Sequence, residues 1–393
     1  MHDHVMELSR RYLFHPDSIE VMAEVFKGDL VRAIESLRRP GPRYFLRANT
    51  LKVSAGELAA RLGSLGVPIY RHECLDEAIY MNVEGPLAIP DVGKRVVVDK
   101  YAAESVMQGA HVYAPAILKC SRLRRGDEVA ITDVHGQIVG VGRMVMGESE
   151  ILTYRRGLAV MVTSPIYRVP SMRETEEYKC GLLHPQSLPA MVTSRVLDPQ
   201  PGETIIDLNC SPGGKLTHIS QLMQNTGTVI GVDRNRRKID AARYNVERLG
   251  CSNVKLLVSD SRYLHLDYPS LRADRCLVDP PCSGLGVSPK LYVTTTRDQI
   301  RSLADYQKQF LKAASMVVKT GGTIVYSVCT FTREECEGVV RFGVESLGLE
   351  VAEQNPHLGG GGLDDFGDDA ELLQRFTPHE FGIGYFIARF IKR

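Results

Sequence analysis

Residues 204–222, TIIDLNCSPGGKLTHISQL, describe a strand, a tight loop and the first turns of a helix. The apolar run carries Asp207, and the loop that follows carries Gly213 and Gly214. Adjacent glycines let the backbone approach a ligand closely, and a helix N-terminus offers free N–H groups to a negative group. This order is typical of the nucleotide-binding turn in a doubly wound α/β sheet.

Two further apolar runs lead to acidic residues. Residues 229–232 precede Asp233, and residues 254–258 precede Asp260. At the ends of neighbouring parallel strands, Asp233 is placed to accept ribose hydroxyls and Asp260 to face an adenine amino group. A helix cap or a turn is the alternative role for any one of these acids.

The loop also limits the ligand. It matches neither the dinucleotide pattern G-x-G-x-x-G nor the P-loop pattern, which disfavours a Rossmann dehydrogenase and excludes a P-loop enzyme. Three acids in one crevice would repel a pyrophosphate but tolerate a sulfonium cation. The sequence therefore favours S-adenosylmethionine over NAD.

Two cysteines follow two later apolar runs. Cys282 lies in the stretch DPPCSG at 279–284, and Cys329 lies in YSVCT at 326–330. Both thiols and the carboxylate of Asp279 are expected at the active edge of the sheet. Because a thiolate is a strong nucleophile, this group suggests covalent catalysis. The alternative is two small buried apolar residues, and the residues alone leave open which cysteine attacks.

Length and composition limit the classes of protein to which this chain can belong. The chain has 393 residues, a formal net charge of +1 and 9 cysteines. The near-neutral charge means that any nucleic-acid surface must be a local patch. The cysteines show no zinc-site spacing, so we expect no metal. No apolar run approaches the ~20 residues that cross a bilayer, and the start lacks a secretory signal. We expect a soluble, cytoplasmic monomer that does not bind membranes.

The chain divides into three expected parts. Residues 1–92 read as a small α/β subdomain, with a strand at 43–49 and a helix that is capped by Ser54 and Glu57 and continues with an apolar stripe of Leu58, Leu62 and Leu65. Residues 93–168 hold short strands near 96–98, 128–131, 137–142 and 158–162, separated by turns, which is typical of a small barrel. Residues 169–393 alternate strands with helices, which predicts a mostly parallel sheet.

These motifs resemble those of the Sun-domain RNA cytosine-5 methyltransferases. RANTLK at 47–52 is similar to the N-terminal signature of that family, residues 207–215 to its cofactor loop, and 326–330 to the motif of its catalytic cysteine. The stretch 277–284 matches D-P-P-C-S-G fully, and 384–388 resembles the closing strand. Asn209, Ser211, Val328 and Thr330 depart from the usual residues, whereas the cysteines, acids, glycines and lysine remain. The resemblance implies an active enzyme with a Rossmann-like methyltransferase core.

The β-rich insert resembles that of one subfamily of these methyltransferases. Residues 106–116 and 126–129 look like a PUA domain, an RNA-binding pseudobarrel. A PUA insert at this point characterises the sixth-member subfamily, which methylates a cytosine near the 3′ end of the tRNA acceptor stem. The same chemistry on ribosomal or messenger RNA is one alternative, and an inactive RNA-binding scaffold is another.

The resemblance also assigns roles. It makes Cys329 the nucleophile that adds to carbon 6 of cytosine, Asp279 the partner of ring nitrogen N3, and Cys282 the residue that acts in release. Lys215 would contact the cofactor carboxylate or Asp279, with a solvated lysine as the alternative. The expected cofactor-binding residues are Asp207, Cys210, Ser211, Pro212, Gly213, Gly214, Lys215, Asp233, Lys238, Asp260 and Asp279.

A cationic cluster in the β-rich insert is the expected RNA contact. It comprises Lys119, Arg122, Arg124 and Arg125, with Tyr113 and His111 beside it. Cations gathered on one face bind phosphates with salt-dependent affinity. A second cluster, Arg234, Arg236, Arg237 and Lys238, lies beside the cofactor loop and fits a solvated surface equally well.

Overall fold

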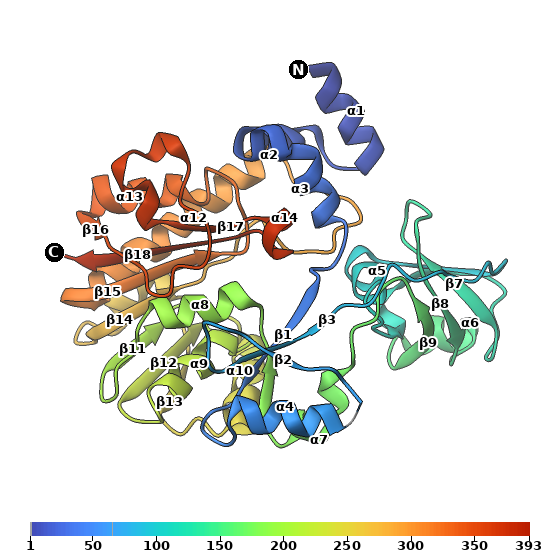
Figure 1. The fold of residues 1–393 in the computed structure, drawn as a ribbon, viewed down its shortest axis with the longest axis horizontal. Helices are drawn as coiled ribbons and strands as arrows, with labels where there is room; N and C mark the ends of the chain where they lie inside the picture. Colours follow the sequence, from blue (N-terminus) through green and yellow to red (C-terminus); the bar gives the residue numbers. More distant parts are fainter. Residues whose placement is uncertain (1, 65) are drawn as a thin grey trace.

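The computed structural model describes residues 2–64 and 66–393, arranged as a large α/β body joined to a smaller β-rich lobe (Figure 1). The body contains a sheet in the order β13-β12-β11-β14-β15-β18-β16, with β17 paired to β18. Its first five strands run parallel, and β18 runs antiparallel to its neighbours. The predicted mostly parallel sheet is confirmed. Its strands are β11 (Thr204–Asp207), β12 (Thr228–Asp233), β13 (Val254–Val258), β14 (Ala273–Val278), β15 (Val318–Val328), β16 (Leu349–Val351), β17 (Gln374–Phe376) and β18 (Tyr385–Lys392).

Helices cover both faces of this sheet, which explains the continuous apolar strands. Successive residues of a strand point to opposite faces, so Ile205 and Ile206 enter two separate cores. One core includes residues of α8 (Leu188–Val196), α9 (Gly214–Leu222) and α10 (Arg236–Leu249). The other includes residues of α12 (Arg297–Val317) and α13 (Glu337–Leu347). Three short helices complete the body: α7 (Glu176–Lys179), α11 (Leu264–Asp267) and α14 (Pro378–Phe381).

The described N-terminal residues form four α-helices and contribute strands to a small sheet. The sheet has the order β10-β1-β3-β2, so β10, which follows the β-rich lobe in sequence, completes it by pairing Leu46 with Pro185. The predicted helix cap is confirmed, because Ser54 and Glu57 exchange hydrogen bonds at the start of α4; Leu65, which we expected to continue this helix, lies outside the described residues. The elements are α1 (His2–Tyr12), α2 (Pro16–Phe26), α3 (Leu30–Leu37), β1 (Arg43–Ala48), α4 (Ala55–Ser64), β2 (Tyr70–Arg71), β3 (Ala78–Asn82) and β10 (Leu183–Pro185).

The β-rich lobe is a curved sheet with its own core. Its strand order is β5-β9-β8-β7-β4-β6, and the predicted strands occur where expected. Leu291, from the catalytic part of the chain, is buried in this core and attaches the lobe to the body. The elements are β4 (Arg95–Val98), α5 (Lys100–Val106), β5 (Val112–Tyr113), β6 (Ile117–Cys120), β7 (Glu128–Thr132), β8 (Ile138–Met144), α6 (Glu148–Tyr154) and β9 (Leu158–Pro165). Among the described residues, no helix combines the length and apolar character that crossing a bilayer requires.

Candidate active site

The two cysteines meet at the carboxyl edge of the sheet. β14 and β15 are parallel neighbours, with Val278 opposite Tyr326, so Asp279 and the cysteines leave the sheet at the same edge. The Sγ atoms of Cys282 and Cys329 are 3.3 Å apart. At this separation one thiol can donate its proton to the other sulfur.

The surroundings distinguish the two sulfurs. The hydrogen bond with Cys282 lowers the pKa of Cys329, against the opposing effects of burial and Asp279, and the charges of Lys215 and Lys290 act in the same lowering direction. The same bond, together with burial, raises the pKa of Cys282 well above its ordinary value. Cys329 is therefore the sulfur that ionises first, with Cys282 as the S–H donor.

Asp279 is held from two sides. Lys215 Nζ lies 2.7 Å from one carboxylate oxygen, and Ser327 Oγ donates to the other at 3.1 Å. Tyr385 in turn donates its hydroxyl to Ser327 and lies beneath Lys215 Nζ, 5.6 Å from the ring centroid. Burial acts to lower the pKa of Lys215, but the Asp279 carboxylate outweighs burial and raises it. Lys215 is therefore a charged partner of Asp279 in this structure.

A buried network supports the loop that carries Cys282. Ser283 donates its hydroxyl and its backbone N–H to Glu335, and its hydroxyl also contacts Thr330, the residue after Cys329. Gln307 donates to Glu335 and to the carbonyl of Pro281. The two cysteine loops are therefore tied to one carboxylate, which limits their movement relative to each other.

The cofactor loop has the expected conformation. Gly213 has φ 104°, a left-handed value that favours glycine, and α9 begins at the next residue. Asp207 is buried, and burial together with the nearby charge of Asp279 raises its pKa to about 7. The side chain of Cys210 packs against Gly231, and Ser211 donates to the carbonyl of Lys238. The Cys210 side chain is therefore part of the core, and its N–H donates to the carbonyl of Val232.

Asp233 and Asp260, the acids that follow β12 and β13, line one small cavity together with Asn209 of the cofactor loop. Asp233 ends β12, and Lys238 Nζ lies 3.9 Å from its carboxylate. Asp260 is ion-paired with Arg262 at 2.6 Å, which lowers the pKa of Asp260. Carboxylates beside apolar walls suit the hydroxyls and base of an adenosine group, and two acids disfavour a phosphate. The lining includes Leu208, Asn209, Asp233, Lys238, Asp260, Pro281 and Phe310.

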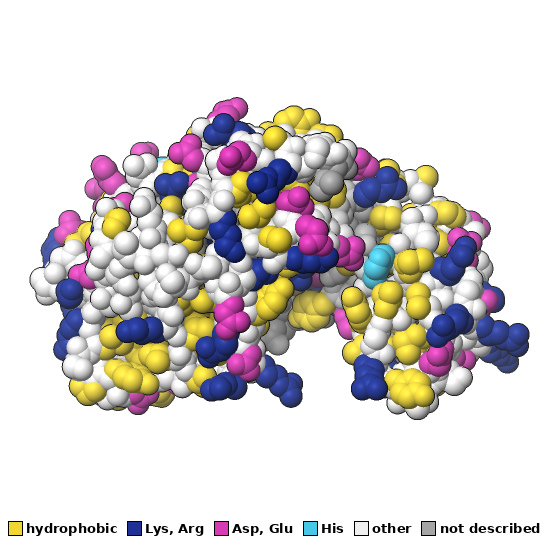
Figure 2. Space-filling model, turned by 90° about the horizontal axis from the view of Figure 1, so that it is seen from below, with side chains coloured by type: hydrophobic (Ala, Val, Ile, Leu, Met, Phe, Trp, Pro, Cys, Tyr) yellow, Lys and Arg dark blue, Asp and Glu magenta, His cyan; other side chains and the backbone are white. Residues whose placement is uncertain are grey.

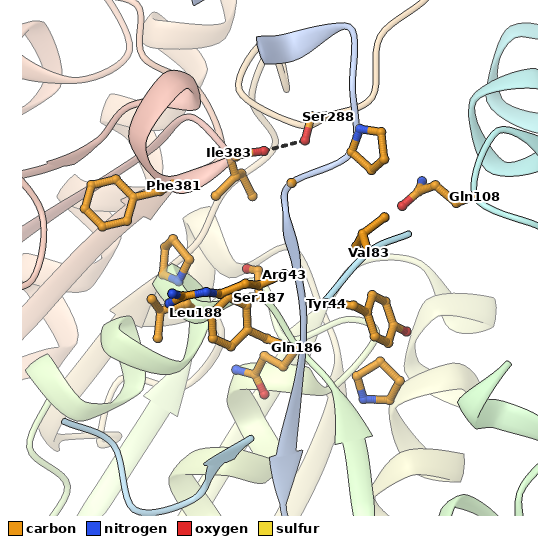
Figure 3. A pocket seen from close by; sticks show the side chains of 16 residues that line it. Arg43, Tyr44, Val83, Gln108, Gln186, Ser187, Leu188, Ser288, Phe381 and Ile383 are labelled. Carbon is orange, nitrogen blue, oxygen red and sulfur yellow. Dashed lines mark hydrogen bonds between the residues drawn. The ribbon is translucent and has the colours of Figure 1, made fainter. Parts of the chain in front are cut away.

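A larger cleft opens where the three parts of the chain meet (Figure 3). Arg43 and Tyr44 of β1, Gln108 of the β-rich lobe and Ile383 of the body contribute to its walls. Its rim is joined to the active loop, because Ser288 donates to the Gly382 carbonyl and Gly286 N–H donates to the Cys329 carbonyl. The cleft is thus connected to the loop that carries Cys282 and, through Gly286, to the backbone of Cys329.

The expected RNA-binding residues lie on the surface of the β-rich lobe. Lys119, Arg122, Arg124 and Arg125 are exposed, as are Tyr113 and His111. Arg125 pairs with Glu150 at 3.2 Å, and His111 Nδ1 accepts the N–H of Val162, so two of the six already have protein partners. Figure 2 shows a hollow between the lobe and the body, with Lys and Arg side chains on both rims.

Sequence reasoning missed several residues around the thiols. Ser327 and Tyr385 position Asp279, Glu335 joins the two loops, and Lys290 lies near both sulfurs. Ser327 precedes Cys329 by two residues and could have been predicted from the alternation of the strand. The others depend on contacts between distant segments, which no local pattern indicates.

The doubly wound sheet, the nucleoside cavity and the adjacent cysteine loops define an S-adenosylmethionine-dependent methyltransferase. The family model of the 16S rRNA methyltransferase RsmB/F matches residues 194–391, and the PUA domain model matches residues 94–166. This chain belongs to the RsmB/F methyltransferase family and carries a PUA domain.

Individual relatives cover nearly the whole chain. It is 40% identical over 373 residues to a tRNA (cytosine(72)-C(5))-methyltransferase of Pyrococcus horikoshii, spanning 93% of each chain. It is 30% identical to the human tRNA (cytosine(72)-C(5))-methyltransferase NSUN6, with 86% of this chain and 84% of the relative covered. A crystal structure of NSun6 from Pyrococcus horikoshii with SFG, an S-adenosylmethionine analogue, superposes with a TM-score of 0.88 at 40% identity, covering 97% of this chain and 99% of that one.

Proposed function

We propose that the protein transfers a methyl group to carbon 5 of cytosine 72 of tRNA, in the acceptor stem near the 3′ end. The observation that carries this proposal is the 3.3 Å contact between the sulfurs of Cys282 and Cys329 beside Asp279. The substrate is taken from the named relatives and from the PUA domain. The family description also names ribosomal RNA, which is the second candidate substrate.

The first step uses the ionised sulfur. Carbon 5 of cytosine is a weak nucleophile, so the Cys329 thiolate adds to carbon 6 and converts the ring to an enamine. As the thiolate adds, ring nitrogen N3 would take up a proton from the Asp279–Lys215 pair, which Ser327 helps to hold, and the adduct is then a neutral enamine. The target base must leave its stack to reach this edge of the sheet.

The cofactor site supports the second step. When bound, S-adenosylmethionine would supply an electrophilic methyl group for carbon 5. The loop at 209–215 would hold its amino-acid end, and Asp233 and Asp260 its ribose and base. After methylation, the proton on carbon 5 passes to solvent water, the electrons of that bond re-form the 5,6 double bond, and Cys329 leaves as a thiolate. N3 returns its proton to the Asp279–Lys215 pair, and Cys282 acts in this release step.

A pair of variants tests the assignment of the cysteines. Cys282→Ala is expected to accumulate a covalent enzyme–RNA adduct, because addition proceeds and release fails. Cys329→Ala is expected to form none, because the nucleophile is absent. Denaturing gels after incubation with tRNA and S-adenosylmethionine report the adduct, and binding of S-adenosylhomocysteine by both variants serves as the folding control. An adduct in Cys329→Ala alone would exchange the two roles.

We also propose that the enzyme acts as a cytoplasmic monomer without a metal. Among residues 2–64 and 66–393, no three His, Cys, Asp or Glu side chains gather as metal ligands. Light scattering during size-exclusion chromatography tests the monomer, and assays in the presence of EDTA test the metal. An inactive scaffold is disfavoured because the thiols, Asp279 and Lys215 together have no evident structural use.

A further inference from the structure

The segment 290–293 connects the active loop to the other two parts of the molecule. The backbone N–H of Lys290 donates to Leu37 of α3 at 2.7 Å. The N–H of the next residue, Leu291, donates to Glu104 of α5 in the PUA domain at 3.0 Å. The loop that carries Cys282 therefore ends at the junction of the PUA domain, the N-terminal helices and the body.

Lys290 is the unexplained residue of this junction. It is only 8% exposed, yet no hydrogen-bond acceptor or ion-pair partner for its ammonium occurs among the described residues. Burial, followed by the charge of Lys100, lowers the pKa of Lys290 to about 8. The stem of this side chain is buried while Nζ itself is not a fully buried atom, so an anion can reach the unpaired ammonium and would stabilise it.

A second lysine approaches from the PUA domain. Lys100 Nζ lies 3.9 Å from the carboxylate of Glu104 and 5.1 Å from the ring centroid of Tyr292. That carboxylate also accepts the N–H of Leu291, and it is the acid whose charge acts on both lysines. The two ammonium groups therefore lie near one shared carboxylate, and Asp99 and Asp133 act on the neighbouring Tyr292.

The cluster also lies close to the reaction. Gly286, four residues before Lys290 in the same loop, donates its N–H to the Cys329 carbonyl, and the charges of Cys329 and Cys282 both act on Lys290. Lys100 begins α5 of the PUA domain, on the other side of the junction. A strand of RNA that contacts the PUA domain and places a base at Cys329 must cross this junction, and every nucleotide it brings carries one phosphate charge.

We propose that Lys290 and Lys100 together bind a backbone phosphate of the RNA substrate at the junction between the PUA domain and the active loop. This site rests on the proposed function, because RNA supplies the anion. One lysine belongs to the loop that carries Cys282 and the other to the PUA domain. The phosphate therefore fixes the position of the nucleotide chain relative to both the catalytic sulfurs and the RNA-binding lobe.

Salt-dependent binding of a full-length tRNA transcript tests this site. For Lys290→Met, the slope of log affinity against log salt concentration should fall by about one phosphate contact, and the KM for RNA should rise on the order of tenfold. The affinity for S-adenosylhomocysteine should stay unchanged. Lys290→Arg should retain the wild-type slope because it keeps the charge, and Lys312→Met, at an exposed position on α12, is the matched control.

Several outcomes would overturn the site. A wild-type salt slope in Lys290→Met would do so, as would a loss shared equally by Lys290→Arg. A changed pH dependence of Cys329 alkylation with an unchanged salt slope would instead make Lys290 a support of the thiolate. If Lys290→Met fails to fold, the salt dependence of tRNA binding by Lys100→Met tests the site instead. If the wild type binds tRNA but methylates no cytosine, the proposed function is wrong. The salt dependence of tRNA binding by Lys290→Met still tests the phosphate site in that case.

Discussion

At the scale of single residues, one proton between two sulfurs determines the chemistry. Cys282 and Cys329 share one hydrogen bond in which either sulfur can donate; with Cys282 as the donor, that bond raises the pKa of Cys282 and lowers the pKa of Cys329. A thiolate is the nucleophilic form, and a nearby S–H donor stabilises it. This arrangement agrees with the family resemblance, which makes Cys329 the attacking residue.

Alkylation of the cysteines across pH tests this proton arrangement. Cys329 loses its thiolate as pH falls through its lowered pKa, so its reaction with iodoacetamide should persist below the pH at which an ordinary thiol becomes unreactive. Cys282→Ala removes the donor, so the midpoint for Cys329 should move to higher pH. Mass spectrometry gives the rate at each site, and the exposed Cys74 is the internal reference. Preferential alkylation of Cys282, or an unmoved midpoint, would argue against the arrangement.

The residues nearest the reaction were only partly predictable. Cys329, Cys282 and Asp279 could be placed together because parallel strands end at one edge of a sheet. We expected Lys215 to contact either the cofactor carboxylate or Asp279, and the structure shows the contact with Asp279 at 2.7 Å. The sequence could not indicate Tyr385 or Lys290, because each reaches the site through the packing of separate segments.

At the scale of elements, the N-terminal sheet holds the helix that follows the cofactor loop. Arg47 of β1 is buried and donates to the carbonyl of Gly214 at 2.6 Å and to Thr217 at 2.8 Å. Glu77 accepts from His218 of the same helix and pairs with Arg195 of α8. The N-terminal subdomain is therefore part of the support of α9, as well as a candidate RNA surface.

The buried contact of His218 predicts acid sensitivity. Burial lowers the pKa of His218 to about 4, from 6.5. Between these values the unfolded chain binds a proton that the folded chain does not, so stability falls as pH drops from 6.5 towards 4, by at most about 3 kcal/mol. The lowered pKa of Glu77 adds a further loss at lower pH. Urea unfolding at several pH values measures this dependence.

A conservative variant isolates that contribution. His218→Gln keeps a donor for Glu77 but cannot titrate, so its unfolding free energy should depend less on pH between 6.5 and 4. A variant of the exposed His4, His4→Gln, is the control and should match the wild type. Equal pH dependence in His218→Gln and the wild type would show that His218 is not the sensitive group.

Most strands could be predicted from the sequence, but which strands pair with each other was harder to predict. The alternation and apolar runs indicated β11, β12, β13, β14 and β15 and, in the PUA domain, β4, β7, β8 and β9, whereas the short β5 and β6 were not predicted. The pairing of β1 with β10 was not predicted, because Leu46 and Pro185 are separated by the whole PUA domain in sequence. Pairing between strands so far apart in sequence depends on how the whole molecule packs, and local sequence patterns do not indicate it.

At the scale of the whole molecule, the active site lies where three parts meet. Leu291 is buried in the PUA core, and Arg38 of the N-terminal part donates to its carbonyl and to Gln137. A net charge of +1 gives no global attraction to RNA, so binding depends on local cations beside the cleft. The three-part organisation was expected from composition and spacing, whereas the docking of the PUA domain through the active loop was not. The residue boundaries assigned to the three parts remain predictions.

Bisulfite sequencing of tRNA after incubation with enzyme and S-adenosylmethionine tests the central claim most directly. The account predicts one newly protected cytosine, at position 72 beside the 3′ end of the acceptor stem, with the wild type and none with Cys329→Ala. Protection of cytosines only in ribosomal RNA, or equal protection by Cys329→Ala, would contradict it.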